Sequence, residues 1–439
     1  MTSSKSHNKL LSSFFVLALC LGGISALFMA TSEDNSSGAT PAGYIPVSNA
    51  DDLARVGSGI SFGGYSWSLS ASYYQTTDIQ LTGVNNFNPI GNFAGGTSTD
   101  VSQAFSGTYD GNHKKIIGLH AIQTKSDSGS LLFALFRAVN DATLKNITVD
   151  NANFVLTTDV SSTSSMITGN VHSAIFAYYV LGSSVIEQCA VVNSTISGNI
   201  SAEVPGVKTL SLYAFVGSLL GTSQVRDCYV ANVDLIDSST TSHYRTAGGI
   251  SGPNWDASLS NFHVNGLTLN TVNAVPLGVN QIGAVIAYPT LYPIPVSNLY
   301  YSDCNLSDAT ATHILDPTDQ SKYVGFDFEN VWEMGADYPV FLSPLVTISG
   351  TPATGFVGVE YSFSPFVNPS DAVMTISGPA WLSVYENSII GTPIAPGTYN
   401  VVITVTKAGF TSAEQTFAIT VYEKLVFLSS PSAGYWVEG

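Results

Sequence analysis

Between residues 144 and 301 the chain repeats a short pattern of apolar and polar positions. In each copy the first, fourth and sixth positions are apolar and the second is polar. Strand side chains alternate between two faces, so this spacing predicts strands with one buried face. The segments start 42, 39, 34 and 37 residues apart: LKNITV (144–149), IEQCAV (186–191), VRDCYV (225–230), LSNFHV (259–264) and VSNLYY (296–301).

The third and fourth positions of these segments form two columns with different chemistry. Asn, Asp and Gln tolerate left-handed backbone and bond to neighbouring amides, so the third position predicts a bend between two strands. The third column contains Asn146, Gln188, Asp227, Asn261 and Asn298. The fourth column, predicted to be core, contains Ile147, Cys189, Cys228, Phe262 and Leu299. In-register neighbours point their side chains alike, so Cys189 and Cys228 are expected to be stacked thiols without a disulfide.

A second apolar segment with small residues precedes each copy and is expected to form the remaining wall of each repeat. A strand, an amide-lined bend and a second strand at this interval predict a right-handed parallel β-helix, in which each rung buries its apolar face by stacking on the next. The upstream segments are SLLFALFRAV (130–139), HSAIFAYYVLG (172–182), LYAFVGSLLG (212–221), RTAGGISG (245–252) and NQIGAVIAYP (280–289).

One helix is expected, opened by Ser48 and covering the exposed end of the stack. Asp51 and Asp52 lie in its first turn, where carboxylates favour the amino end. An uncovered end of a parallel stack invites edge pairing, so a capping helix has a clear physical purpose.

The pattern changes after residue 344. Residues 345–422 predict a small β-sandwich, because alternate residues along 398–406 divide into an apolar and a polar face. The apolar face has Tyr399, Val401, Ile403 and Val405, and the other has Thr398, Asn400, Thr404 and Thr406. Residues 423–439 are interpreted as the start of a further unit or as a tail.

The ordered motifs of residues 45–344 resemble the GLUG-repeat family of adhesin-like surface proteins. They are SNADDLARV (48–56), YYQTTDIQL (73–81), NPIGNF (88–93), FSGTYDGNHKKIIGL (105–119), LLFALF (131–136) and the closing GFDFENVWEMGADYPVF (325–341). The resemblance implies a cell-surface role, and it implies that Asp110 and Gly111 of YDGNH form a structural turn in which Gly111 supplies a permissive backbone.

The C-terminal region resembles the immunoglobulin-like, cadherin-like modules repeated on many prokaryotic surface proteins. The resemblance rests on SGTPATGFVGVEYSF (349–363), GPAWLSVYENSIIGTP (378–393) and APGTYNVVITVTKAGF (395–410). It implies that this module acts as a spacer or in binding.

The first 30 residues predict export. Lys5 and Lys9 precede an uncharged apolar stretch from Leu10 to Ala30, which is either a signal peptide or a retained membrane anchor. Residues 31–44 are a linker. The body is expected outside the cell or on its surface, where five sequons are candidate glycosylation sites, at Asn35, Asn146, Asn193, Asn199 and Asn305.

Charge and composition exclude several partners and cofactors. The net charge is −17, and the 14 Lys and Arg residues form no run, so nucleic acid and anionic membranes are not expected to bind. Besides Cys20, three cysteines and scattered histidines show no metal-ligand spacing, so no metal or other cofactor is expected.

The candidate catalytic residues do not converge in the sequence. Gly59–Gly63 matches G-x-S-x-G around Ser61 without the strand and helix that a nucleophile elbow needs. Asp110 and His113 are interpreted as part of a turn. We therefore expect a non-enzymatic surface protein that contacts glycans or other surface proteins, with Tyr229 and Tyr300 as exposed contacts.

Two alternatives remain open at this point. A β-helical polysaccharide lyase or hydrolase would need clustered acids, for which Asp227, Asp234 and Asp237 near Arg226 are the densest group. A passive component of the cell envelope would need no specific ligand.

Overall fold

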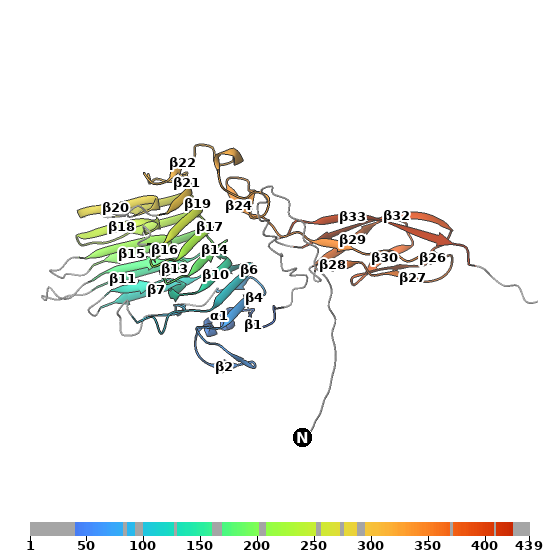
Figure 1. Cartoon of the computed structure of the whole chain (residues 1–439), viewed down its shortest axis with the longest axis horizontal. Coiled ribbons are helices and arrows are strands. Elements are labelled where there is room, and N and C mark those ends of the chain that lie inside the picture. Colours follow the sequence, from blue (N-terminus) through green and yellow to red (C-terminus); the bar gives the residue numbers. More distant parts are fainter. Residues whose placement is uncertain are drawn as a thin grey trace, which may run out of the picture.

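The computed structural model describes residues 40–81, 86–92, 100–126, 130–159, 169–201, 208–251, 256–272, 276–287, 295–368, 372–407 and 410–424. Strands make up 58% of the chain and helices 3%, which confirms the all-β class. A parallel β-solenoid of about five turns is followed by an immunoglobulin-like domain. Figure 1 shows the solenoid in blue to yellow and the immunoglobulin-like domain in orange to red. No helix within the described ranges is long and apolar enough to cross a membrane.

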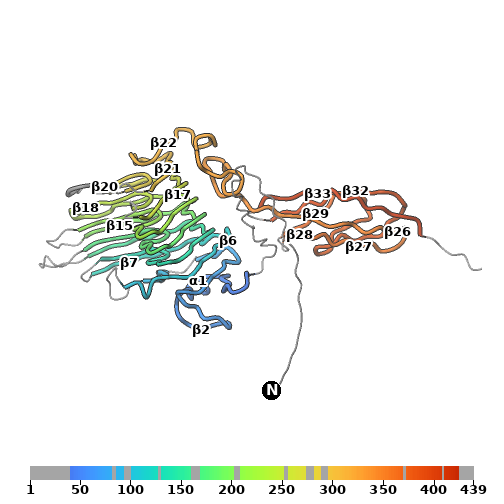
Figure 2. Tube along the Cα trace, in the orientation of Figure 1, coloured from blue at the N-terminus to red at the C-terminus, as the bar shows by residue number. Residues whose placement is uncertain are grey.

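Two parallel sheets form the walls of the solenoid. The larger sheet contains β1 (Tyr44–Val47), β4 (Ser72–Gln75), β5 (Ile79–Gln80), β6 (Thr108–Ile117), β7 (His120–Lys125), β10 (Thr143–Asp150), β11 (Asn153–Thr158), β14 (Val185–Glu187), β15 (Ala190–Ile200), β17 (Gln224–Asp237), β19 (Ser258–Thr271), β21 (Val296–Ser302) and β22 (Thr312–His313). The second contains β8 (Leu131–Phe133), β9 (Phe136–Asn140), β12 (Val171–Ala174), β13 (Ala177–Leu181), β16 (Thr209–Leu219), β18 (His243–Ile250) and β20 (Pro276–Ile286). Figure 2 follows the trace rising through the stacked rungs.

The five repeat segments lie one above another in a single register. Leu144 pairs with Ile186, Ile186 with Val225, Val225 with Leu259, and Leu259 with Val296. The upstream apolar segments form the second sheet, which pairs in the order β20-β18-β16-β12-β8. Each rung therefore buries its apolar face against its neighbours, as stacking requires.

A stack of phenylalanine rings fills the core between the walls. Neighbouring ring centroids are 6.0 Å apart for Phe136 and Phe176, 4.8 Å for Phe176 and Phe215, and 5.4 Å for Phe215 and Phe262. All four rings are fully buried. Such aromatic pairs add about 0.5–1.5 kcal/mol each beyond the burial of their surface.

The N-terminal end of the stack carries the predicted helix, α1 (Ala50–Arg55), but Ser48 does not open it. The N-cap is Asn49, whose side-chain oxygen accepts a hydrogen bond from the Asp52 amide at 2.9 Å. Ser48 instead donates its hydroxyl to the Asp52 carboxylate at 2.7 Å. Asparagine is at least as good an N-cap as serine, which explains the shift of one residue. Leu53 anchors α1 in the solenoid core.

Side chains close the strand edges at both ends of the solenoid. At the N-terminal end Asn86 accepts from the Ile122 amide at 2.8 Å. At the C-terminal end the Asp308 carboxylate accepts from the amides of Val285 and Ile286, at 2.8 and 2.6 Å. Asn305 both accepts from the Leu269 amide and donates to its carbonyl. These groups occupy the positions that another strand would take.

The segment after the last rung folds back over the outer face of the larger sheet. It includes the 3-10 helix η2 (Gln320–Lys322) and the hairpin of β23 (Trp332–Met334) and β24 (Pro339–Phe341). We call residues 316–343 the closing segment. Its Trp332 is fully buried and packs on Tyr229 and His263 of the sheet. A second, smaller core therefore lies outside the solenoid.

The C-terminal domain is a set of short sheets around a core of its own, with antiparallel pairings except for the parallel pair of β26 and β33. One sheet has the order β26-β33-β32-β29, a second has β27-β31-β30, and β25 pairs with β28. Val401, Ile403 and Val405 are fully buried, so the predicted apolar face is confirmed. The strands are β25 (Thr347–Ser349), β26 (Gly355–Phe356), β27 (Tyr361–Phe363), β28 (Phe366–Asn368), β29 (Val373–Ser377), β30 (Leu382–Tyr385), β31 (Ser388–Gly391), β32 (Gly397–Thr406) and β33 (Ala413–Tyr422).

Candidate functional site

The amide column lies at one bend of the larger sheet. All five of its members have left-handed backbone: φ is 57° at Asn146, 50° at Gln188, 51° at Asp227, 49° at Asn261 and 55° at Asn298. Strand pairings on both sides of the bend place the five residues one above another. The column is thus a continuous structural feature of the solenoid, formed by the residue types that adopt this conformation most readily.

Side-chain hydrogen bonds along the axis join members of this column to one another and join Asn146 to Asp110 of the preceding rung. The amide nitrogen of Asn146 donates to Asp110 at 3.0 Å, that of Asn261 donates to Asp227 at 2.9 Å, and that of Asn298 donates to Asn261 at 2.8 Å. The polar groups most suited to bind a ligand are therefore already bonded to one another. This arrangement stabilises stacking and leaves few of them free for chemistry.

A second polar column follows five residues after the first, and sequence reasoning missed it. It contains Asn151, Asn193, Asn232 and Asp303, all with left-handed φ, and Gly266 occupies the same bend. The Asn193 amide donates to Asp150 at 3.0 Å, and the Asn232 amide donates to Asn193 at 3.3 Å. The sequence does contain a signal for this second bend. An Asn or Gly follows the first column by five residues in VDN (149–151), VVN (191–193), VAN (230–232) and VNG (264–266).

The core column is buried as its apolar character requires. Ile147, Cys189, Cys228 and Phe262 are fully buried, and Leu299 is 4% exposed. Both cysteines are free thiols, as expected, and the backbone amide of Cys189 donates to the Cys228 sulfur at 3.4 Å. Burial raises the pKa of the Cys228 thiol well above its usual value, so Cys228 is a packing residue without thiolate reactivity.

Asp110 and His113 lie at an enlarged bend in the first full rung. Asp110 pairs with Lys145 and Lys114 pairs with Ile147, so residues 111–113 lie opposite the single residue Asn146. The Asp110 carboxylate accepts from the Asn112 amide at 2.9 Å, as a turn residue does. The extra length turns the exposed His113 side chain outward.

Gly111 does not supply the permissive backbone that the family resemblance implied. The positive φ angles of this bend fall on Asn112 and His113, at 51° and 53°. Glycine is required at position 111 for a steric reason, because a Cβ there would lie 2.3 Å from the carbonyl oxygen of Asn146. Close stacking of the next rung, and not a left-handed angle, selects this glycine.

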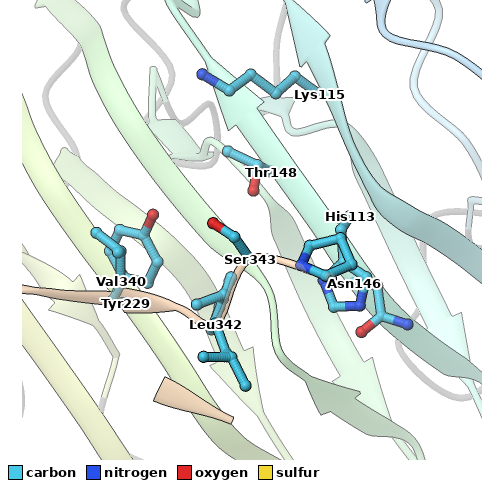
Figure 3. A pocket seen from close by; sticks show the side chains of 10 residues that line it. His113, Lys115, Asn146, Thr148, Tyr229, Val340, Leu342 and Ser343 are labelled. Carbon is cyan, nitrogen blue, oxygen red and sulfur yellow. The ribbon is translucent and has the colours of Figure 1, made fainter. Parts of the chain in front are cut away.

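A cleft of about 190 Å³ with a mixed polar and apolar lining lies between this bend and the end of the closing segment. Figure 3 shows His113, Asn146 and Thr148 on the sheet side and Leu342 and Ser343 on the other. Lys115 lies at the edge of the cleft, above Thr148 in Figure 3, and forms an ion pair with Asp150 at 2.9 Å. The cleft is lined by one histidine and no carboxylate, and its other ionisable side chains are Lys115, which is ion-paired, and Tyr229, which is buried.

Tyr229 and Tyr300 are not exposed contacts, and that prediction was wrong. They are 7% and 6% exposed because the closing segment covers them. His263 lies between them in the same column, stacked flat on Tyr229 at a centroid distance of 5.2 Å. Outward-facing strand positions are normally solvent-exposed, so only the position of a segment far along the chain could reveal their burial.

The acids near Arg226 do not form a cluster. Arg226 pairs with Glu187, Asp227 accepts from Asn261 in the amide column, and Asp234 accepts from the Thr268 hydroxyl. Asp237 is fully buried at the end of β17. Each side chain therefore has a separate structural partner.

Asp237 belongs to a buried polar group of its own. Its carboxylate bonds to the ring of His243 at 3.0 Å and accepts from the Arg245 guanidinium, whose Nε lies at 2.7 Å. Burial alone would raise the pKa of Asp237, but hydrogen bonds from His243 and Ser239 lower it to about 2. The charged form is thus satisfied internally, as a buried ion pair requires.

The last candidates are the possible nucleophile Ser61 and the possible metal ligands. Ser61 is exposed in a small hairpin formed by β2 (Ser61–Phe62) and β3 (Tyr65–Ser66), which is not a strand–turn–helix elbow. Within the part of the chain that the structure describes, no group of three or more His, Cys, Asp or Glu side chains is arranged to hold a metal ion.

Three candidate glycosylation sites use their side-chain amides in the fold. Asn146 and Asn193 donate within the two polar columns, and Asn305 donates to the Leu269 carbonyl. Attaching a glycan to any of them would replace one of the two hydrogens on the donating nitrogen. Asn199 is half-buried, and its side-chain oxygen has no hydrogen-bond partner. Asn35 lies outside the described residues.

Comparison with known proteins identifies the C-terminal domain. Residues 344–422 match the family model described as "Putative Ig domain". The match confirms the predicted immunoglobulin-like module. No curated protein matches the chain.

Proposed function

We propose that this protein is an exported, non-enzymatic cell-surface protein of the adhesin type, related to the GLUG-repeat proteins that its motifs resemble. The observation that carries the proposal is a β-solenoid joined directly to an immunoglobulin-like module. An extended stack displays residues along its flanks, and such modules are spacing and binding units.

The use of polar residues in the solenoid supports a binding role over catalysis. The carboxylates that a lyase or hydrolase would need each bond to a different structural partner. The asparagine columns and the buried ion pair stabilise the stack itself. Large solenoids present long surfaces to other molecules, and extended glycans or surface proteins suit them.

Two measurements on the same cells test the proposal. Protease treatment of intact cells that express the protein should release peptides from the solenoid and the module while cytosolic markers stay intact. Cells without the gene should adhere less to glycan-coated or cell-coated surfaces, and the purified chain should compete with adhesion. Recovery of the peptides from the cytosol alone would contradict export, and unchanged adhesion would favour a passive envelope component.

An enzyme assay on the purified protein completes the test. Acidic and neutral polysaccharides should yield no reducing sugar or unsaturated product. Turnover that is lost in Asp227→Ala or Asp234→Ala would instead establish the lyase or hydrolase alternative.

A further inference from the structure

The hairpin at the N-terminal end of the solenoid exposes an unusual set of apolar side chains. Ile60, Phe62 and Tyr65 are 45%, 52% and 42% exposed, within six consecutive residues. Figure 1 shows β2 standing clear of the stack beyond α1. A cluster of exposed large apolar residues on one small element marks an interaction surface.

The pairing of the two strands places these side chains together. Phe62 lies directly opposite Tyr65, so both project from the same face of the hairpin. Ile60 precedes Phe62 by two residues and projects the same way. Ser61 pairs with Ser66, which puts the two serines on the opposite face. The hairpin therefore has one apolar, aromatic face and one polar face.

The geometry of the hairpin is fixed by its turn and by its base. Gly63 and Gly64 both have positive φ, 63° and 82°, which is the two-residue turn that matches the twist of paired strands. At the base, Trp67 is 2% exposed, and its indole nitrogen donates to the Phe62 carbonyl at 3.1 Å. The aromatic pair is thus held out by a preorganised support, which lowers the entropic cost of binding.

Polar groups lie beside the aromatic face. The Arg55 guanidinium carbon is 4.0 Å from the centre of the Phe62 ring. Arg55 also forms an ion pair with Asp52 at 2.9 Å. One place on the surface therefore combines an aromatic ring with the N–H donors of a guanidinium, whereas the Asp52 carboxylate already accepts from Ser48 and Asn49.

We infer that this face, formed by Ile60, Phe62 and Tyr65 beside Arg55, is a binding site for a neutral glycan. A sugar ring has an apolar C–H face that stacks on an aromatic ring and hydroxyls at its rim that bond to a guanidinium. The inference rests on the proposed function and names its site and partner class.

Size and charge favour a glycan over other occupants. The exposed parts of the three side chains amount to on the order of 250 Å², whereas a stable protein interface needs about 800 Å² from each partner. One or two sugar rings match the smaller area. The net charge of −17 and the neighbouring Asp52 disfavour an anionic membrane or a polyanion.

The test uses the full chain on an array of neutral oligosaccharides, with Phe62→Ser/Tyr65→Ser as the variant. The matched control is Tyr385→Ser, because Tyr385 is a tyrosine of the immunoglobulin-like module that is 62% exposed. We expect the wild type and the control to bind the same glycans. We expect binding by the double variant to be at least tenfold weaker at an unchanged melting temperature.

Each other outcome overturns the inference and bears differently on the proposed function. Equal glycan binding by the wild type and the double variant would remove the site while leaving the adhesin proposal intact. Binding to phosphatidylcholine vesicles or to a protein, with no glycan bound, would replace the partner class. Whole-cell adhesion without any glycan binding would contradict the glycan site and leave the adhesin function standing, because adhesion does not require that site.

Tyr65→Phe and Phe62→Tyr keep the aromatic face and distinguish a stacking role from a general apolar one. Both should retain glycan binding within about threefold. If Phe62→Leu retains binding equally well, stacking is not the basis of recognition and the inference fails.

Discussion

At the scale of single residues, the left-handed bends explain why asparagine and aspartate recur in this chain. Among the residues that the structure describes, eleven of the fourteen non-glycine residues with positive φ are Asn or Asp, and the other three are His113, Gln188 and Glu386. Three of them serve twice, because Asn232, Asn261 and Asn298 permit the angle and also donate to the same position in the neighbouring rung. The residue type is therefore selected by backbone conformation and by stacking together.

The middle of the first column provides the clearest test. Asn261 donates to Asp227 and accepts from Asn298, so Asn261→Ala removes two ladder bonds and forces alanine into a left-handed angle. We expect the free energy of unfolding to fall by about 1–3 kcal/mol, measured by chemical denaturation. Asn261→Gly keeps the angle without strain and should lose less. Equal, negligible losses in both variants would show that the ladder contributes nothing.

At the scale of elements, the last strands matter because a solenoid ends in open edges. The second sheet ends at β20, and among the strands that the structure describes only β18 pairs with it. Asp308 is 9% exposed and is held in place by the Thr310 amide at 2.8 Å. A carboxylate buried there satisfies two backbone amides and prevents another strand from adding.

Asp308→Ala should therefore be destabilising and should promote self-association. Two backbone amides would lose their acceptor, and each buried unpaired donor costs about 1–3 kcal/mol. Asp316→Ala is the matched control, because Asp316 forms the same local turn with the Thr318 amide but closes no strand edge. Denaturation and light scattering measure the two effects. Similar behaviour of both variants would refute the role of Asp308 as an edge cap.

At the scale of the whole molecule, the closing segment packs against the outer face of the larger sheet of the solenoid. Its contact includes His263, which is 1% exposed and bonds to the Pro339 carbonyl at 2.8 Å. Burial lowers the pKa of His263 to about 3, and the bond to Pro339 opposes that shift only in part. The ring is therefore neutral in the folded protein, and protonating it there costs free energy.

The pH dependence of stability follows from that pKa. The unfolded state binds a proton near pH 6.5 and the folded state near pH 3, so stability is retained above pH 6.5 and falls as the pH drops between these values. The contribution of His263 to this loss should approach about 1.4 kcal/mol per pH unit within the window. His172, whose pKa burial lowers to about 4, adds a loss of the same sign. Asp237 adds a loss only below about pH 4, because its folded pKa is about 2.

Replacement of the histidine isolates this contribution. His263→Phe should reduce the slope of the stability profile between pH 6 and pH 4 and leave the contribution of His172, whose pKa burial lowers to about 4. His313→Phe, at an exposed position, should leave the slope as in the wild type. Denaturation curves at several pH values provide the measurement. A wild-type slope in His263→Phe would show that His263 does not carry the effect.

The sequence by itself determined the repeat, because each column of a stack places one residue type in one environment. Apolar positions at period two and amides at the bend therefore specified the register, the parallel solenoid and the sandwich face of β32. Only the tertiary structure decided what covers the outer surface. Tyr229 and Tyr300 looked exposed by their strand position, but residues 316–343 return to bury them. Conversely, Phe62 and Tyr65 look like core residues and are left in solvent. The alternation of apolar and polar residues indicates which face of a strand a residue occupies. The burial of that face depends on contacts made by segments that are distant in the sequence.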